Sequence, residues 1–216
     1  MHIPDGFLDT TTSVVTWVAS GGSIAYAVQR ASKELDERQV PLMGVSAAFI
    51  FAAQMINFTI AGGTSGHLLG GALAAILLGP WAGMLVITSV LAIQALLFQD
   101  GGLLALGANI FNMAVIGVLL GWAVYTGVKR LFGDKTWSTM AGGFAAAWLS
   151  VVVASLVAAV ELALSGASPW GVVLPTMAGV HALIGIGEGL ITVAVLAFLR
   201  VTRPDLLTLR QAKAKV

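Results

Sequence analysis

Long apolar runs with few charged residues dominate the amino-acid sequence and restrict the folds that it can adopt. Only 10% of the 216 residues are charged and 58% are hydrophobic, whereas a soluble domain carries about a quarter charged residues. An apolar helix of about 20 residues can cross a bilayer because it satisfies its own backbone hydrogen bonds there. The runs do not alternate as the strands of a β-barrel do. The sequence therefore predicts an all-α, polytopic membrane protein.

The apolar runs predict one transmembrane domain over residues 1–216, with about seven helices in a single bundle. We expect an outer N-terminal segment at residues 1–12, a helical bundle at 13–200 and a basic cytoplasmic tail at 201–216. The third helix is too short to cross a full bilayer upright, so it is tilted, enclosed by protein or only part of a span. The expected helices lie near residues 13–31, 41–60, 67–79, 81–98, 105–128, 138–164 and 177–200.

The basic residues indicate how the helices cross the membrane. All 11 Lys and Arg residues fall into three segments, within residues 30–38, 129–135 and 200–215. The positive-inside rule assigns such segments to the cytoplasm. Seven spans then place the N-terminus on the outer face together with three turns that lack Lys and Arg: 61–66, 99–104 and 165–176. The predicted topology is N-out and C-in, and a net charge of +1 provides no basic field for nucleic acid.

The first candidate binding site is the N-terminus itself, Met1-His2, on the outer face. The chain contains no cysteine, so nitrogen or oxygen atoms would have to hold a metal. Residues 1–6 lack the basic and apolar regions of a cleavable signal, so we expect Met1 to be the mature N-terminus. Its amine, the His2 backbone nitrogen and the His2 ring nitrogen nearest the backbone can wrap one cation. A fourth nitrogen would complete a square-planar site, typical of Ni(II) or Cu(II); the alternative is a solvated histidine.

A second histidine follows a glycine-rich turn on the same face. His67 lies within residues 61–71, whose small side chains let another segment approach closely. A histidine at a helix entrance in a membrane is a candidate functional residue, although it can also be packed against a backbone carbonyl. A ligating histidine needs a partner for its other ring nitrogen, and we expect Asn57 and Ser65 to give this support. For the amides, structural hydrogen bonds between helices are the alternative.

Three other polar residues suggest a different mechanism. Glu161 and Glu188 lie inside apolar runs, where a carboxylate must face protein or water. His181 shares a helix face with Glu188, about two turns away. These groups could form the proton path of a secondary transporter, or they could make structural contacts. The sequence around Ser65 also matches the G-x-S-G pattern of rhomboid intramembrane proteases, with His181 as the base.

Small residues recur every four positions along the first helix, at Ala19, Ser23, Ala27 and Ala31. Such a stripe lets another helix come close. It serves either internal packing or the docking of a partner subunit. No Walker A sequence occurs, so the chain is not expected to hydrolyse ATP itself.

Taken together, these motifs resemble the CbiM/NikM family, the substrate-specific components of cobalt and nickel energy-coupling-factor transporters. The resemblance implies that the Met1 amine, the His2 backbone and side-chain nitrogens and His67 chelate the metal. This set agrees with the donors argued above from the residues alone. The resemblance rests on six segments: residues 1–7, 61–71, 98–102, 109–112, 179–182 and 187–189.

The resemblance also implies an ATP-driven importer of Ni(II) or Co(II) in the cytoplasmic membrane of a prokaryote, with nickel slightly favoured. Residues 1–12 would cover the metal, which is the transported substrate rather than a cofactor. The expected partners are a transmembrane coupling subunit, two cytoplasmic ATPase subunits and, in some members, a small accessory membrane subunit. The coupling subunit would contact the small-residue stripe of the first helix. The chain itself would not be an enzyme; the proton-driven transporter and, less favoured, the protease are the alternatives.

Overall fold

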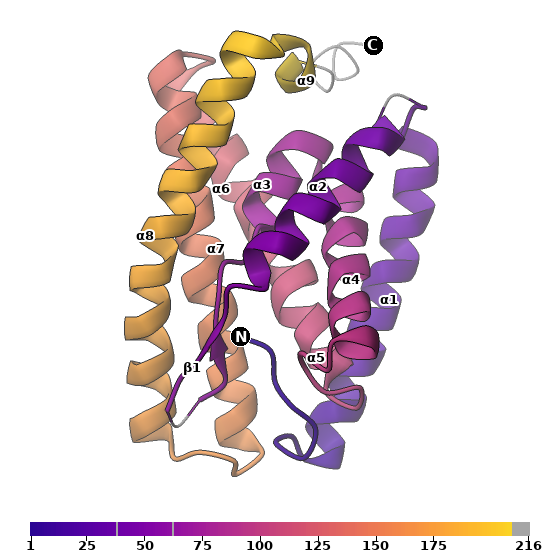
Figure 1. Cartoon of the computed structure of the whole chain (residues 1–216), viewed down its shortest axis with the longest axis vertical. Coiled ribbons are helices and arrows are strands. Elements are labelled where there is room, and N and C mark those ends of the chain that lie inside the picture. The colour runs from indigo at the N-terminus through magenta and orange to yellow at the C-terminus, as the bar shows by residue number, and fades with distance from the viewer. Residues whose placement is uncertain (38, 62, 209–216) are drawn as a thin grey trace.

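The computed structural model describes residues 1–37, 39–61 and 63–208, and it shows a bundle of helices that run roughly along one axis (Figure 1). Arg38 of the first basic segment, Gly62 of the glycine-rich turn and residues 209–216 of the tail lie outside the described residues. The elements are α1 (Thr10–Glu34), α2 (Gln39–Gln54), β1 (Phe58–Thr59), β2 (Ser65–Gly66), α3 (Gly71–Leu78), α4 (Pro80–Leu97), α5 (Leu106–Asn109), the π-helical η1 (Ile110–Ile116), α6 (Gly117–Phe132), α7 (Thr136–Leu164), α8 (Trp170–Thr202) and α9 (Pro204–Thr208).

Among the described residues, four helical stretches are long and apolar enough to cross a membrane: α4, the continuous stretch Leu106–Phe132, α7 and α8. They confirm the expected all-helical membrane bundle. The remaining helices of the bundle do not meet both conditions. α1 is long, at 25 residues, but carries more polar side chains, whereas α2 has 16 residues and α3 has eight.

The segment after α2 differs from the helix expected at residues 41–60. α2 ends at Gln54, and β1 and β2 form a short antiparallel hairpin in which Phe58 pairs with Gly66. The glycine-rich turn that follows Ile60 cannot favour a helix, because glycine loses more backbone freedom on folding than any other residue. The next helix is therefore shorter than the expected 67–79, and His67 lies on an irregular segment in front of α3.

The last long helix begins earlier than the expected residue 177. α8 starts at Trp170 and contains Pro175, so the expected turn at 165–176 shrinks to residues 165–169. Proline is tolerated inside membrane helices because neighbouring groups can satisfy the freed backbone carbonyl. α8 also runs beyond residue 200 to Thr202, and the beginning of the predicted tail is the short helix α9.

The two ends of the bundle are built differently. The α1–α2 connection and α9 lie together at the upper end in Figure 1, whereas the hairpin and the 165–169 turn lie at the lower end. The N-terminus is inside the lower half, between α8 and the other helices (Figure 1). The described segments that carry the basic residues therefore lie at the end opposite the hairpin.

Close helix packing in the centre depends on a glycine of α6. A Cβ atom added at Gly121 would lie 2.8 Å from Cα of Ala72, the second residue of α3. This position is therefore a backbone-to-backbone contact between α6 and α3. Gly127 lies on the same helix, but nothing lies within 4 Å of an added Cβ there.

We predict that Gly121→Ala destabilises the protein whereas Gly127→Ala does not. The added methyl group must push α3 away from α6, and overpacking of this kind costs about 1–3 kcal/mol. At Gly127 alanine has room and is favoured in a helix over glycine by about 1 kcal/mol. Thermal unfolding of both variants in detergent tests this prediction. Equal melting temperatures would show that α3 and α6 can move apart to accommodate the methyl group without a loss of stability.

Candidate metal centre

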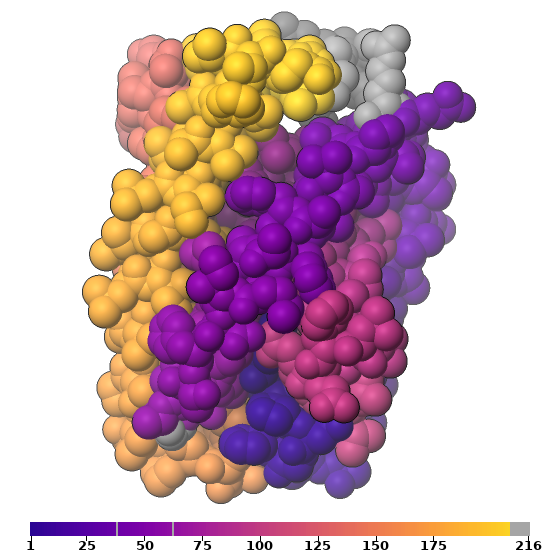
Figure 2. Space-filling model, viewed as in Figure 1, coloured from indigo at the N-terminus to yellow at the C-terminus, as the bar shows by residue number. Residues whose placement is uncertain are grey.

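The N-terminal segment enters the bundle between the hairpin and the loop that follows α4. Its indigo atoms fill the gap between these elements in Figure 2. Met1 and Ile3 are completely buried and His2 is 3% exposed. The first three residues of the chain are therefore enclosed by the protein and are not exposed to solvent.

Hydrogen bonds from the loop and the following helix hold this segment in place. The Ile3 N–H donates to Oδ1 of Asn109 at 2.8 Å, and Nδ2 of Asn109 donates to the Ile3 carbonyl at 3.1 Å. The same carbonyl accepts from the Gly102 N–H at 2.9 Å. The Asp5 carboxylate accepts backbone hydrogen bonds at the start of the 106–132 helix, from Leu103, Leu104 and Ala105. The N-terminal segment thus caps the start of the 106–132 helix, and Asn109 of that helix in turn holds the segment in place.

Ser65 of β2 accepts hydrogen bonds from the first two backbone nitrogen atoms of the chain. The Met1 amine donates to the carbonyl oxygen of Ser65 and to its Oγ, the latter at 3.1 Å, and the His2 N–H donates to the same Oγ at 3.1 Å. Burial lowers the pKa of the Met1 amine well below its usual value, against a smaller opposing effect of Asp100. Burial therefore favours the neutral form of the amine, whose lone pair stays free while its hydrogens bond Ser65.

Two buried side chains hold the segment that carries His67. Nε2 of Gln54 donates to the Leu69 carbonyl at 2.6 Å. The Glu188 carboxylate accepts from the N–H groups of Leu69 at 2.5 Å and Gly70 at 2.8 Å. Gly70 has a φ of 76°, a left-handed conformation that favours glycine, at the N-cap of α3. These contacts satisfy the backbone N–H and carbonyl groups just after His67, although this part of the chain belongs to no helix.

The protonation of His67 follows from its neighbours. Nδ1 lies 2.7 Å from the Leu68 carbonyl, which can only accept, so Nδ1 carries the proton and Nε2 carries the lone pair. That Nε2 atom is buried and has no hydrogen-bond partner in the described part of the chain. Burial lowers the pKa of His67 well below its usual value, and the nearby charges of the N-terminus, His2 and His181 lower it further. His67 therefore offers a neutral nitrogen donor inside the protein.

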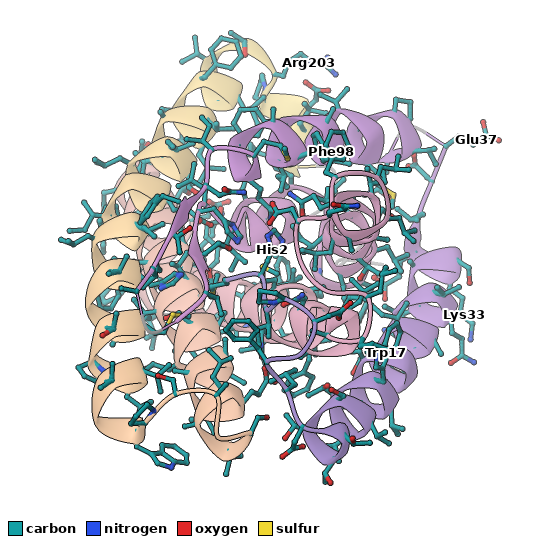
Figure 3. All side chains as sticks on the ribbon, turned by 60° about the horizontal axis from the view of Figure 1, so that its bottom comes forward. His2, Trp17, Lys33, Glu37, Phe98 and Arg203 are labelled. Carbon is teal, nitrogen blue, oxygen red and sulfur yellow. The ribbon has the colours of Figure 1, made fainter. Side chains whose placement is uncertain are left out.

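His2 lies in the middle of the bundle (Figure 3). Its ring stacks on that of His67, with ring centroids 4.5 Å apart and ring planes 19° from parallel. Nδ1 of His2 lies 2.9 Å from Oδ1 of Asp100. Burial lowers the pKa of His2 more than Asp100 and Gln94 raise it. Burial raises the pKa of Asp100, but His2, the Met1 amine and Asn57 together bring it below its usual value.

Residues 2–206 match the CbiM family, described as the cobalt uptake substrate-specific transmembrane region. The chain belongs to the CbiM family. It is therefore a multi-pass substrate-specific membrane component of a nickel or cobalt uptake transporter, and a transport protein rather than an enzyme. The protease alternative is wrong.

Two relatives and a solved structure agree with this assignment of the CbiM-family chain. A protein of Haloquadratum walsbyi is 46% identical over 95% of this chain and 93% of its own length. The fused nickel transport protein NikMN of Rhodobacter capsulatus is 38% identical over 99% of this chain, which covers 66% of that longer protein. The crystal structure of a truncated transition metal transporter has a TM-score of 0.86 at 37% identity, covering 92% of this chain and 98% of that one.

The structure brings together Met1, His2 and His67, the three residues that the sequence predicted as ligands. Of the two predicted supporting residues, Ser65 contacts the Met1 and His2 nitrogens directly. Asn57 is exposed and instead donates to Oδ2 of Asp100 at 2.9 Å, so it acts on His2 only through that carboxylate. The role of all five residues in metal binding stays a prediction.

The stripe of small residues on α1 mostly faces the bundle. Ala27 and Ala31 are buried within the chain, so internal packing, the alternative to docking, accounts for these two. Ala19 and Ser23 are only partly buried. Contact with a coupling subunit stays a prediction for Ala19 and Ser23, but Ala27 and Ala31 are covered already.

The polar residues needed by the two alternatives, the proton-driven transporter and the protease, make contacts that are separate from one another. Glu161 accepts from Nδ2 of Asn112 on η1 at 2.6 Å. His181 has Nδ1 at 2.9 Å from the Met177 carbonyl, and its Nε2 has no partner among the described residues. Together with the backbone contacts of Glu188, this leaves no hydrogen-bonded path that joins Glu161, His181 and Glu188, and no hydrogen-bonded serine–histidine pair, within residues 1–37, 39–61 and 63–208.

Three residues around the site were not predicted: Asp5, Gln94 and Asp100. Gln94 is a polar residue inside an apolar run, the same signal that singled out Glu161, and its completely buried amide has no hydrogen bond. Asp100 lies in the 99–104 turn, which the predicted topology puts on the same outer face as His2. No group of three or more His, Asp and Glu side chains among the described residues could hold a metal ion. A metal here would therefore depend on backbone nitrogens as well as on two imidazoles.

We predict that Asn109→Ala exposes the Met1 amine to acylation. The variant removes both side-chain hydrogen bonds to Ile3 and leaves its buried backbone groups partly unsatisfied, which favours opening of the segment by about tenfold or more. Mass spectrometry of the N-terminal peptide after reaction with a water-soluble amine-reactive ester measures this. Asn57→Ala, which does not touch residues 1–5, is the matched control; equal labelling of Asn109→Ala and wild type would contradict the role of this clamp.

Proposed function

We propose that the chain captures Ni(II) or Co(II) on the outer side of the membrane, for import by an ATP-driven energy-coupling-factor complex. The metal is held by four nitrogens: the Met1 amine, the His2 backbone nitrogen, Nδ1 of His2 and Nε2 of His67. The single observation that carries this proposal is the buried Nε2 of His67. It is a neutral donor without a partner, and it lies beside a neutral N-terminal amine.

The neighbours of these nitrogens support planar chelation. Both N–H groups of a metal-bound amine can still donate to Ser65, because the metal takes only the lone pair. When the His2 amide loses its proton, the Ser65 hydroxyl can turn from acceptor to donor, since Oγ already lies 3.1 Å from that nitrogen. Four nitrogens of this kind favour Ni(II), and they favour Cu(II) still more, so supply rather than affinity excludes copper.

The His2 ring must change tautomer when it binds. In the unloaded protein the neutral ring places its Nδ1 proton beside Asp100. Chelation through Nδ1 moves the proton to Nε2, and rotation of the ring can direct it to Asp100 or to the unpartnered amide of Gln94. A ligating histidine generally has such a partner for its other nitrogen.

Membership of the family supports the wider assembly that we propose. We place residues 1–12 and the hairpin on the outer face and the basic end in the cytoplasm, with seven membrane segments in which α3 is only part of a span. A transmembrane coupling subunit and two cytoplasmic ATPase subunits drive release, and a small accessory membrane subunit assists in part of the family. The partly buried Ala19 and Ser23 of α1 are the residues of the stripe left for contact with the coupling subunit.

We predict that one residue added before Met1 abolishes stoichiometric Ni(II) binding. The extension converts the amine into an amide and has no room inside the bundle, because Met1 is completely buried. Isothermal titration calorimetry on detergent-purified protein measures the loss. The matched control is a cleavable extension whose removal regenerates Met1 and restores binding; full binding by the extended protein would exclude the N-terminal chelate.

We also predict that Ni(II) affinity rises with pH through one proton. Burial lowers the pKa values of the Met1 amine and His67, so it favours the neutral, metal-binding form of both groups. Only the His2 amide then loses a proton, and affinity rises about tenfold per pH unit near neutrality. Calorimetry in buffers of different ionisation enthalpy should count about one proton per metal. A count of zero would show that the amide stays protonated, and a higher count that the amine or imidazole is charged beforehand.

A further inference from the structure

The turn after α4 places one carboxylate against the ring of His2. Oδ1 of Asp100 lies 2.9 Å from Nδ1 of His2, and its Oδ2 accepts from Nδ2 of Asn57 at 2.9 Å. The Asp100 N–H donates to the carbonyl of Gln94, near the end of α4, at 3.0 Å. Gly101 has a φ of 95°, and a Cβ atom added there would lie 3.4 Å from Cβ of His2. The backbone of the turn therefore approaches His2 closely and holds the carboxylate beside its ring.

The charge of Asp100 has no lysine or arginine beside it. Within the described ranges its one ion-pair contact is with the His2 ring, whose neutral form burial favours because it lowers the pKa of His2. The described segments with lysine and arginine lie at the opposite end of the bundle (Figure 1). Burial would raise the pKa of Asp100, but the His2 ring, the Met1 amine and Asn57 hold it below its usual value. The carboxylate is therefore ionised at neutral pH without a cationic side chain to balance it.

The other carboxylates in this half of the bundle and inside it make contacts elsewhere. Asp5 and Asp9 each accept backbone N–H groups at the start of a helix. Glu161 accepts from an asparagine of η1, and Glu188 accepts from the backbone in front of α3. Among the residues that the structure describes, Asp100 alone has a carboxylate in contact with one of the four proposed donor nitrogens.

The proposed chelate brings a net positive charge into a buried place. A divalent cation carries two positive charges, the amine and the two imidazoles are neutral donors, and the deprotonated His2 amide supplies one negative charge. One positive charge remains, and a charge removed from water is costly unless an opposite charge lies close to it. Met1, His2 and His67 are all buried, so water cannot surround this charge. A cation held by the His2 ring is separated from the Asp100 carboxylate by little more than the ring itself.

We propose that Asp100 is the counter-charge of the bound Ni(II) or Co(II): it does not ligate the metal, but its negative charge balances the positive charge that the four nitrogens leave. The inference rests on the proposed function, because it assumes the same chelate. The loaded centre is then neutral overall, and the N-terminal segment can enclose it without burying a net charge. Asp100 thus determines affinity through its charge, and Asn57 holds that charge in place from the hairpin side.

The test compares two substitutions that both remove the charge of Asp100 but differ in shape. Asp100→Asn keeps the size of the side chain and one acceptor oxygen, whereas Asp100→Ala removes both. We expect each to reduce Ni(II) affinity in isothermal titration calorimetry by about tenfold to a hundredfold, and Asp100→Glu to restore most of it. The d–d absorption band of bound Ni(II) should keep its wild-type wavelength in all three variants, because the four nitrogens remain.

The matched control is Asp9→Asn. It removes a carboxylate charge from the same N-terminal segment, at an exposed position that does not contact His2. Asparagine is as good an N-cap as aspartate, so α1 keeps its first turn. This variant should bind Ni(II) as wild type does.

Thermal unfolding in detergent separates the charge of Asp100 from a structural role. Without metal, Asp100→Asn should melt no lower than wild type, because the charge that it removes has no lysine or arginine partner in the described part of the chain. With Ni(II) added at one fixed concentration, the rise in melting temperature should be smaller than in wild type, because a ligand stabilises in proportion to how tightly it binds.

Each outcome decides for or against the counter-charge. Wild-type Ni(II) affinity in Asp100→Asn overturns it, whether or not Asp100→Ala binds weakly, because the shape of the side chain would then matter and its charge would not. A shifted absorption band would make Asp100 a ligand. A lower melting temperature or failure to fold of unloaded Asp100→Asn would make the residue structural, and both results contradict the proposal. Absence of stoichiometric Ni(II) binding by the wild-type protein would instead refute the proposed function.

Discussion

Non-helical backbone can lie inside a membrane bundle only when other protein groups satisfy its amides and carbonyls. Two such segments meet in this chain, residues 1–5 and 65–70. Asn109 and Asp5 tie the first of them to the 106–132 helix. Gln54 and Glu188 tie the second to α2 and α8. The helices therefore do more than cross the membrane, because they also supply side chains that allow irregular backbone to reach the centre of the bundle.

The general class of fold and the three residues at the centre could be predicted from the sequence, because apolar runs and rare histidines are strong local signals. The expected helix through residue 60 failed because strand pairing of Phe58 with Gly66 is decided by packing, which hydropathy does not record. The start of α8 was missed because Pro175 resembles a boundary although the bundle tolerates it. Asp100 was missed because its importance depends on a contact with His2 across nearly a hundred residues of chain.

The chemistry of the centre depends on burial more than on the number of ligating side chains. The same removal from water that keeps the Met1 amine neutral also keeps His67 neutral. In solution both would compete with protons for their lone pairs. Inside the bundle the lone pairs are available, and Ser65 orients the backbone nitrogens without occupying them. The proposed metal site therefore uses only two imidazoles beside its backbone nitrogens.

The enclosure of the N-terminal segment also determines how fast anything beneath it can leave. With Met1 and Ile3 completely buried, exchange requires the segment to detach, which is a local unfolding event. The lifetime of the closed state then depends on the opening free energy, to which Asn109 and Asp5 contribute, as well as on the strength of the ligands. Affinity and residence time are consequently separate properties of this molecule. A force applied to the helix that Asp5 caps would shorten the residence time while every ligand stayed the same.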